Sequence, residues 1–156
     1  MAKGNKLYSD RQEITVANYL GWEQVTGSGA RPTFVGDIVS ESWLGECKTH
    51  ISPGHKIIFR FDVWDKLDKE ASSRFKDPVL IVDDGSQKVE NTYVMLKLKH
   101  PPEDRTPEDY STKASFRFDN NSDFRVSYVI HEFIRDNNYY IILWLPAFKT
   151  LISRSN

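Results

Sequence analysis

The sequence contains very little cysteine. Cys47 is the single cysteine among 156 residues. One thiol excludes an intramolecular disulfide, and it also excludes a zinc centre built from several thiolates. The chain therefore fits a reducing compartment, where cysteines stay unpaired.

Long apolar runs are also absent from the sequence. No stretch approaches the roughly 20 apolar residues that a membrane helix needs. The first residues, Met-Ala-Lys-Gly-Asn-Lys, lack the apolar centre of a secretory signal peptide. We therefore expect no membrane association and a cytoplasmic location, which would be the cytoplasm of a host cell if a phage encodes the chain.

Neither sign of charge predominates. Lys and Arg number 21 and Asp and Glu number 22, which gives a net charge of −1. Composition alone therefore does not indicate a nucleic-acid-binding protein. Between Lys48 and Lys76 basic residues outnumber acidic ones, and this stretch fits either a weak basic surface or the solvated face of a helix with mixed charge.

The chain has enough apolar material for one core. Hydrophobic residues make up 39% and charged residues 28%, which is typical of a globular domain. A length of 156 residues fits a single domain. We expect one domain over 1–156, with a core over about 9–98, a mobile loop over about 100–113, and C-terminal strands and a short helix over 114–156.

Hydrophobic periodicity and turn residues predict the order of the elements. Ser9 and Gln12 have the spacing of a helix-capping box and Gly21 supplies a stop, so a helix is expected over about 10–20. Apolar residues at helical spacing predict a second helix over about 61–74, and Pro146 begins a short third one. Strands are expected over 22–26, 33–40, 43–50, 78–82, 93–98, 124–130 and 139–145, while 57–61 fits a strand or a helix start. This order predicts an α/β (α+β) fold with a central mixed β-sheet flanked by helices.

The strands over 33–40 and 43–50 should pair as a hairpin. A hairpin that turns about Glu41 and Ser42 places Asp37 directly opposite Glu46, on the same face. Lys48 lies two residues beyond Glu46, and side chains alternate along a strand, so Lys48 shares that face. Three charged side chains should therefore converge, while Cys47 points to the other face as a small buried residue.

Two carboxylates this close together repel each other unless they share a proton or a cation. Asp37 and Glu46 with the main-chain carbonyl of Cys47 would form an all-oxygen ligand set, which suits Mg²⁺ or Mn²⁺. Such an ion polarises a phosphodiester and activates a water for attack on phosphorus. Lys48 could then orient the water or offset charge in the transition state.

The same pattern has an alternative interpretation. An acid opposite an acid, with a lysine two residues away, also occurs where a hairpin simply presents charges to solvent. The Glu-x-Lys triplet of Glu46 and Lys48 by itself occurs often by chance. Further features are needed to favour a reactive site over a charged surface.

Short motifs around these residues supply such features. A helix carrying Glu13 precedes Gly27-Ser28-Gly29, which is followed by Gly36-Asp37-Ile38 on one strand and Glu46-Cys47-Lys48 on the next. Over about residues 9–82 this arrangement resembles the PD-(D/E)XK nuclease superfamily, and within it the archaeal and phage Holliday-junction resolvases. The resemblance implies a restriction-endonuclease-like core. Gly36 stands where the superfamily usually has proline.

The resemblance implies a role for each acidic residue. Asp37 and Glu46 would bind the metal ion, and Lys48 would assist the attacking water. Glu13 would contribute through the outer shell of the metal ion.

Three residues are candidates for contacts to DNA. The resemblance implies that Ser28 touches the phosphate backbone. Arg31 and Lys56 are further candidates, because cations near a metal site can hold the phosphates of DNA.

These observations predict a Mg²⁺-dependent endonuclease that acts on DNA, with branched DNA such as a Holliday junction as the preferred substrate. A homodimer is expected, because one compact site cuts one strand and symmetric cleavage needs two. The alternatives are a restriction-type or other DNA nuclease of the same superfamily, and a non-catalytic DNA-binding or assembly protein that retains the fold.

Overall fold

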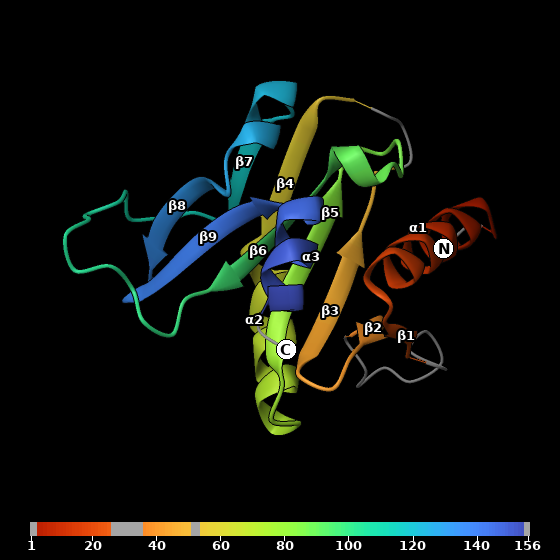
Figure 1. Cartoon of the computed structure of the whole chain (residues 1–156), viewed down its shortest axis with the longest axis horizontal. Helices are drawn as coiled ribbons and strands as arrows, with labels where there is room; N and C mark the ends of the chain where they lie inside the picture. The colour runs from red at the N-terminus through yellow and green to blue at the C-terminus, as the bar shows by residue number, and fades with distance from the viewer. Residues whose placement is uncertain (1–2, 26–35, 51–53, 155–156) are drawn as a thin grey trace.

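The computed structural model describes residues 3–25, 36–50 and 54–154 (Figure 1). Its α-helices are α1 (Lys3–Leu20), α2 (Phe61–Ser73) and α3 (Leu145–Arg154), and its 3-10 helices are η1 (Val89–Asn91) and η2 (Ser122–Val126). Its strands are β1 (Glu23–Gln24), β2 (Ile38–Val39), β3 (Trp43–Lys48), β4 (Lys56–Arg60), β5 (Asp77–Asp83), β6 (Thr92–Lys97), β7 (Ser115–Asp119), β8 (Val129–Arg135) and β9 (Asn138–Trp144).

The strands of the described part of the chain form two sheets. A seven-stranded sheet has the order β1-β2-β3-β5-β6-β9-β8, and β4 pairs with β7 in a separate two-stranded sheet. Within the large sheet β3 and β5 run parallel, whereas the other neighbours are antiparallel. The predicted α+β fold with a mixed central sheet and flanking helices is confirmed.

Apolar side chains cover both faces of the large sheet. On one face α1 and α3 pack against it through Val16, Leu20 and Phe148. On the other face Trp64 and Leu67 of α2 pack together with β4 and β7. Figure 1 shows α1 alongside β3 at one end of the sheet and β8 and β9 at the opposite end. Strand β3, which carries Glu46 and Lys48, therefore lies within the sheet next to α1.

The first helix begins earlier than predicted. It runs from Lys3 through Ser9 and Gln12, so the predicted capping box is wrong. Contacts to a distant segment hold its first turns: the hydroxyl of Tyr8 donates to the carbonyl of Gly85, and Gln87 Nε2 donates to the carbonyl of Tyr8 at 2.5 Å. Gly21, with φ of 73°, ends the helix as expected.

Two predictions in the C-terminal half need correction. Residues 124–130 do not form one strand, because the side chain of Asn121 accepts a hydrogen bond from the nitrogen of Asp123 and the chain enters η2 instead. Strand β7 lies within the C-terminal region but was not predicted, although Phe116, Arg117 and Phe118 alternate as strand residues do.

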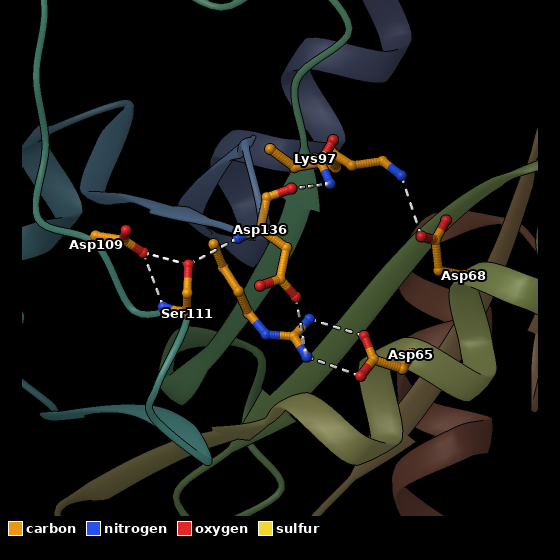
Figure 2. A network of polar contacts seen from close by, with 8 residues as sticks. Asp65, Asp68, Lys97, Asp109, Ser111 and Asp136 are labelled. Atoms are coloured by element: carbon orange, nitrogen blue, oxygen red, sulfur yellow. Dashed lines mark hydrogen bonds and ion pairs between the residues drawn. The ribbon is translucent and has the colours of Figure 1, made fainter.

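The segment between β6 and β7 is tied to the end of the sheet. Tyr110 donates its main-chain N–H to the carbonyl of Ile134 at 2.7 Å. Figure 2 shows Ser111 between Asp109 and Asp136, and the nitrogen of Asp136 donates to Ser111 Oγ at 2.9 Å. The loop expected over about 100–113 is therefore present without helix or strand, and these bonds anchor its second half.

An ion pair joins the same end of the sheet to α2. Arg135 donates two hydrogen bonds to the carboxylate of Asp65, at 2.7 and 2.8 Å, and Lys97 pairs with Asp68 at 3.0 Å (Figure 2). The guanidinium of Arg135 also lies 4.6 Å from the centre of the Phe61 ring. These contacts fix α2 against the strands.

None of the described helices combines the length and the apolarity needed to cross a lipid bilayer.

Candidate functional site

The hairpin register is the one predicted. Ile38 lies opposite Gly45 and Val39 lies opposite Leu44, which continues to Asp37 opposite Glu46. The main-chain nitrogen of Asp37 donates to the carbonyl of Gly45 at 2.8 Å. The tight turn between β2 and β3 therefore determines which side chains meet.

Asp37 is held by the neighbouring strand. Its Oδ2 accepts a hydrogen bond from the main-chain nitrogen of Cys47 at 2.8 Å. The carboxyl groups of Glu46 and Glu13 lie close enough to influence its pKa. The structure thus brings three acidic side chains together, from α1, the start of β2 and the middle of β3.

Glu46 is buried, with 6% of its surface exposed. Its Oε1 pairs with Lys48 Nζ at 3.1 Å, and its Oε2 is buried without a hydrogen-bond partner in the described part of the chain. A carboxylate in this position is not one of a row of solvent-facing charges, so the alternative interpretation as a charged hairpin surface is wrong. A buried acceptor with nothing to accept from is unfavourable unless a ligand or a proton satisfies it.

Burial raises the pKa of each acid, and the charge of Asp37 raises it further for Glu46 and Glu13. Burial, followed by the charge of Asp37, raises the pKa of Glu46 to about 8. The same two causes raise the pKa of Glu13 to about 7, and burial raises that of Asp37 to about 6. Burial lowers the pKa of Lys48, but the charges of Glu46 and Asp37 outweigh it, so this pKa is raised and the amine stays cationic. The three acidic side chains therefore favour the binding of a proton or a cation.

The donor atoms fit a hard divalent cation in part. No three His, Cys, Asp or Glu side chains within residues 3–25, 36–50 and 54–154 are arranged to hold a metal ion by themselves. Asp37 and Glu46 supply two carboxylates, and Mg²⁺ is commonly held by one or two carboxylates with water and substrate phosphates completing its shell. The unpartnered Oε2 of Glu46 is the atom that such a cation would satisfy.

The main-chain N–H and C=O groups of Cys47 face the carboxylate of Asp37. The N–H and C=O of one strand residue point toward the same neighbouring strand, and the N–H of Cys47 points at Asp37. Its carbonyl therefore lies on the side of that carboxylate. The Cys47 side chain is buried among residues of α1 and the sheet, as expected of a small apolar residue on the opposite face.

Gln12 is a site residue that the sequence patterns did not reveal. It is 1% exposed, and its Nε2 donates to the main-chain carbonyl of Lys48 at 2.7 Å. This bond fixes the end of β3 against α1 and places the neighbouring Glu13 beside Asp37. A polar residue on the inward face of a helix was the available signal, but Gln12 was assigned to the capping box.

Gly36 lies where the hairpin packs tightly against the core. A Cβ atom at this position would lie 2.4 Å from Leu44 Cδ1, closer than real Cβ atoms come to a neighbour. Leu44 is fully buried in the core, so its side chain has little room to move away. A side chain at this position would therefore force the packing around Leu44 to shift.

Of the three residues predicted to touch DNA, the structure describes Lys56. Ser28 and Arg31 lie outside the described residues. Lys56 begins β4 and pairs through its Nζ with Asp119 Oδ1 at 2.8 Å, and both side chains are exposed. It belongs to the two-stranded sheet rather than to the carboxylate cluster.

A further buried acidic residue, Asp83, lies at the end of the neighbouring strand. Asp83 ends β5 and is fully buried; its Oδ1 accepts hydrogen bonds from Thr49 Oγ1 at 2.5 Å and from the nitrogen of Gly85 at 2.9 Å. The bond from Thr49 joins the ends of the parallel strands β3 and β5.

Comparison of the chain with family models, with curated proteins and with solved structures gives no match.

Proposed function

We propose that this protein is a metal-dependent endonuclease that hydrolyses phosphodiester bonds in DNA. The observation that carries the proposal is the buried carboxylate of Glu46, whose Oε2 has no partner while Asp37 lies beside it and Lys48 pairs with its other oxygen. A purely structural acid in that position would cost stability, whereas a bound Mg²⁺ or Mn²⁺ turns it into a ligand.

Asp37, Glu46 and the carbonyl of Cys47 would hold the cation. When bound, the cation supplies a Lewis acid for the phosphodiester and lowers the pKa of a water molecule. Lys48 holds its positive charge close to the cluster, where it offsets the negative charge that develops on the phosphoryl oxygens. Glu13, whose pKa is raised to about 7, is placed to accept a proton from the attacking water.

The reaction balances without any further reactant. The oxygen of water forms a bond to phosphorus, and the bond from phosphorus to one sugar oxygen breaks. The products are one strand ending in a phosphate monoester and one ending in a hydroxyl group. Glu13 would take the proton lost by water, which then passes to the departing sugar oxygen or to solvent.

The superfamily assignment belongs to the same proposal. The order of Glu13, Asp37, Glu46 and Lys48 supports membership of the PD-(D/E)XK nucleases, and branched DNA such as a Holliday junction is the substrate that this resemblance favours. A restriction-type target is the alternative within the superfamily. We further propose a homodimer, which symmetric cutting would need, and a cytoplasmic site of action.

Incubation of the purified protein with a panel of DNA substrates tests the proposal. The panel contains duplex, single-stranded, flap and four-way DNA, each with Mg²⁺ or with EDTA. Cutting of at least one substrate in Mg²⁺, absent in EDTA and lost in Asp37→Asn, is the expected result. The absence of cutting on every substrate would overturn the proposal and favour a non-catalytic DNA-binding protein. Equal cutting by Asp37→Asn would overturn the site built on Asp37.

A further inference from the structure

A cavity opens directly beside the carboxylate cluster. Its volume is about 590 Å³, within the roughly 300–1,000 Å³ of pockets that take small organic molecules. Lys48 belongs both to its lining and to the ion pair with Glu46. The cavity and the proposed site are therefore neighbours that share one side chain.

The floor of the cavity is the face of the sheet that carries Glu46. In the parallel pair of β3 and β5, Glu46 lies opposite Leu80 and Lys48 lies opposite Val82. Leu80 and Val82 both line the cavity, and Ile58 of β4 and Val63 of α2 close its apolar walls. A ligand resting on this floor would have its edge next to the carboxylates.

Basic side chains surround the apolar floor. Lys48, Arg60 and Arg117 line the cavity, and no acidic residue of the described chain does. Arg60 is held by two hydrogen bonds to Asp62, whereas Arg117 is in no ion pair with a described acid and donates its Nε to Ser115 Oγ at 2.8 Å. Arg117 therefore has guanidinium N–H groups free to bind an anion.

His50 adds a polar atom to this lining. Its Nε2 is buried and has no hydrogen-bond partner among the described residues. A buried ring nitrogen of this kind can bond to a polar edge of a ligand. Apolar walls, one polar ring and a cationic rim together match a planar base attached to a phosphate.

We propose that this cavity holds an unpaired nucleotide next to the phosphate that is cut. The base would rest between Ile58, Val63 and Leu80, and Arg117 would bind its phosphate. A base inside a duplex cannot enter without unpairing and unstacking, which costs a few kcal/mol, whereas an already unpaired base enters without that cost. DNA with unpaired nucleotides, as at gaps, flaps and branches that contain unpaired bases, is therefore the substrate class. This inference rests on the proposed nuclease function for the position of the cut.

Binding in EDTA tests the cavity separately from cutting. The probe is a duplex that lacks one nucleotide on one strand, and the unpaired nucleotide opposite this gap is 2-aminopurine. The comparison is the same duplex without the gap, in which 2-aminopurine is paired. We expect the wild type to bind the gapped probe at least about tenfold more tightly than the paired one, with a change in 2-aminopurine emission.

Two variants and one control complete the design. Ile58→Trp fills the cavity, and Arg117→Gln removes an exposed charge without touching the core; each should lose about tenfold in affinity for the gapped probe. Lys69→Gln removes an exposed charge on α2 outside the cavity lining and should keep the preference. Equal binding of gapped and paired probes by the wild type, or variants that bind the gapped probe as Lys69→Gln does, would overturn the proposal.

The two proposals fail in different ways. A wild type that prefers the gapped probe in EDTA but cuts no DNA in Mg²⁺ supports the cavity and overturns the nuclease. A wild type that cuts in Mg²⁺ but binds gapped and paired probes equally supports the nuclease and overturns the cavity.

Discussion

The side chain of Gln12 donates a hydrogen bond to the main-chain carbonyl of Lys48 at 2.7 Å, and this single bond joins the first helix to the strand that carries Glu46. Gln12 is almost completely buried. The bond therefore links the position of α1, and with it Glu13, to the position of the lysine at the proposed site.

Replacement of Gln12 should weaken the protein and its site together. Gln12→Ala leaves the carbonyl of Lys48 without its partner, and we expect the free energy of unfolding to fall by about 1–3 kcal/mol. Urea denaturation measures this change. Arg11→Ala, on the exposed side of the same helix, is the matched control and should stay within about 0.5 kcal/mol of the wild type. Equal stability of the two variants would contradict the role given to Gln12.

The raised pKa of Glu46 makes the metal-free protein sensitive to pH. The folded state keeps a proton on Glu46 up to about pH 8, whereas the unfolded chain releases it near pH 4.5. Stability should therefore fall as pH rises from about 5 to about 8, because the unfolded state binds fewer protons in that window. Glu46→Gln cannot lose a proton, so its unfolding free energy in EDTA should change by about 1–3 kcal/mol less over the same range. Parallel pH profiles for the two proteins would refute this assignment.

Metal binding should release protons from the same cluster. A cation binds the ionised carboxylates, so at pH 7 the protons held by Glu46 and Glu13 must leave. Calorimetric titration with Mg²⁺ in two buffers of different ionisation enthalpy should show a release of about one proton per ion. Asp37→Asn should lose most of the binding heat. Binding with the same heat in both buffers would mean that the acids are already ionised.

His131 should limit stability on the acid side. It lies half-buried among the rings of Phe116, Phe118 and Phe124, at centroid distances of 5.3, 4.7 and 5.3 Å, and burial lowers its pKa. The unfolded state then binds more protons than the folded state just below pH 6.5, so stability should fall as pH drops through that region. His131→Phe removes this dependence, and thermal unfolding between pH 5 and 7 measures it. An unchanged slope in the variant would place the acid sensitivity elsewhere.

The local part of the site could be predicted from the sequence. One tight turn and the alternation of side chains were sufficient to place Asp37 opposite Glu46 and Lys48 beside it. The burial of Glu46 was not predictable from the hairpin, because it depends on α1 and α2 packing over the strands from distant parts of the chain. The bond from Gln12 to Lys48 spans 36 residues and was missed for the same reason.

Errors elsewhere in the fold have equally specific causes. Residues 124–130 have strand-forming composition, but the local hydrogen bond from Asp123 to Asn121 competes with the strand and produces η2. Strand β7 is short and its partner β4 lies far away in the sequence, so its pairing depends on tertiary contacts. The cavity that these two strands help to line could not be predicted without that pairing.

The rate of DNA cleavage under single-turnover conditions tests the central claim most directly. Wild type, Asp37→Asn and Lys69→Gln are compared on one DNA substrate that the wild type cuts, with excess enzyme, in Mg²⁺ and in EDTA. Asp37→Asn keeps an oxygen that can accept the bond from Cys47, so the fold should survive while a metal ligand is lost. We predict a rate at least about 100-fold below the wild type for Asp37→Asn, wild-type rates for Lys69→Gln, and no cutting in EDTA. Cleavage by Asp37→Asn within twofold of the wild type, or cleavage that persists in EDTA, would contradict a metal-dependent site built on Asp37 and Glu46.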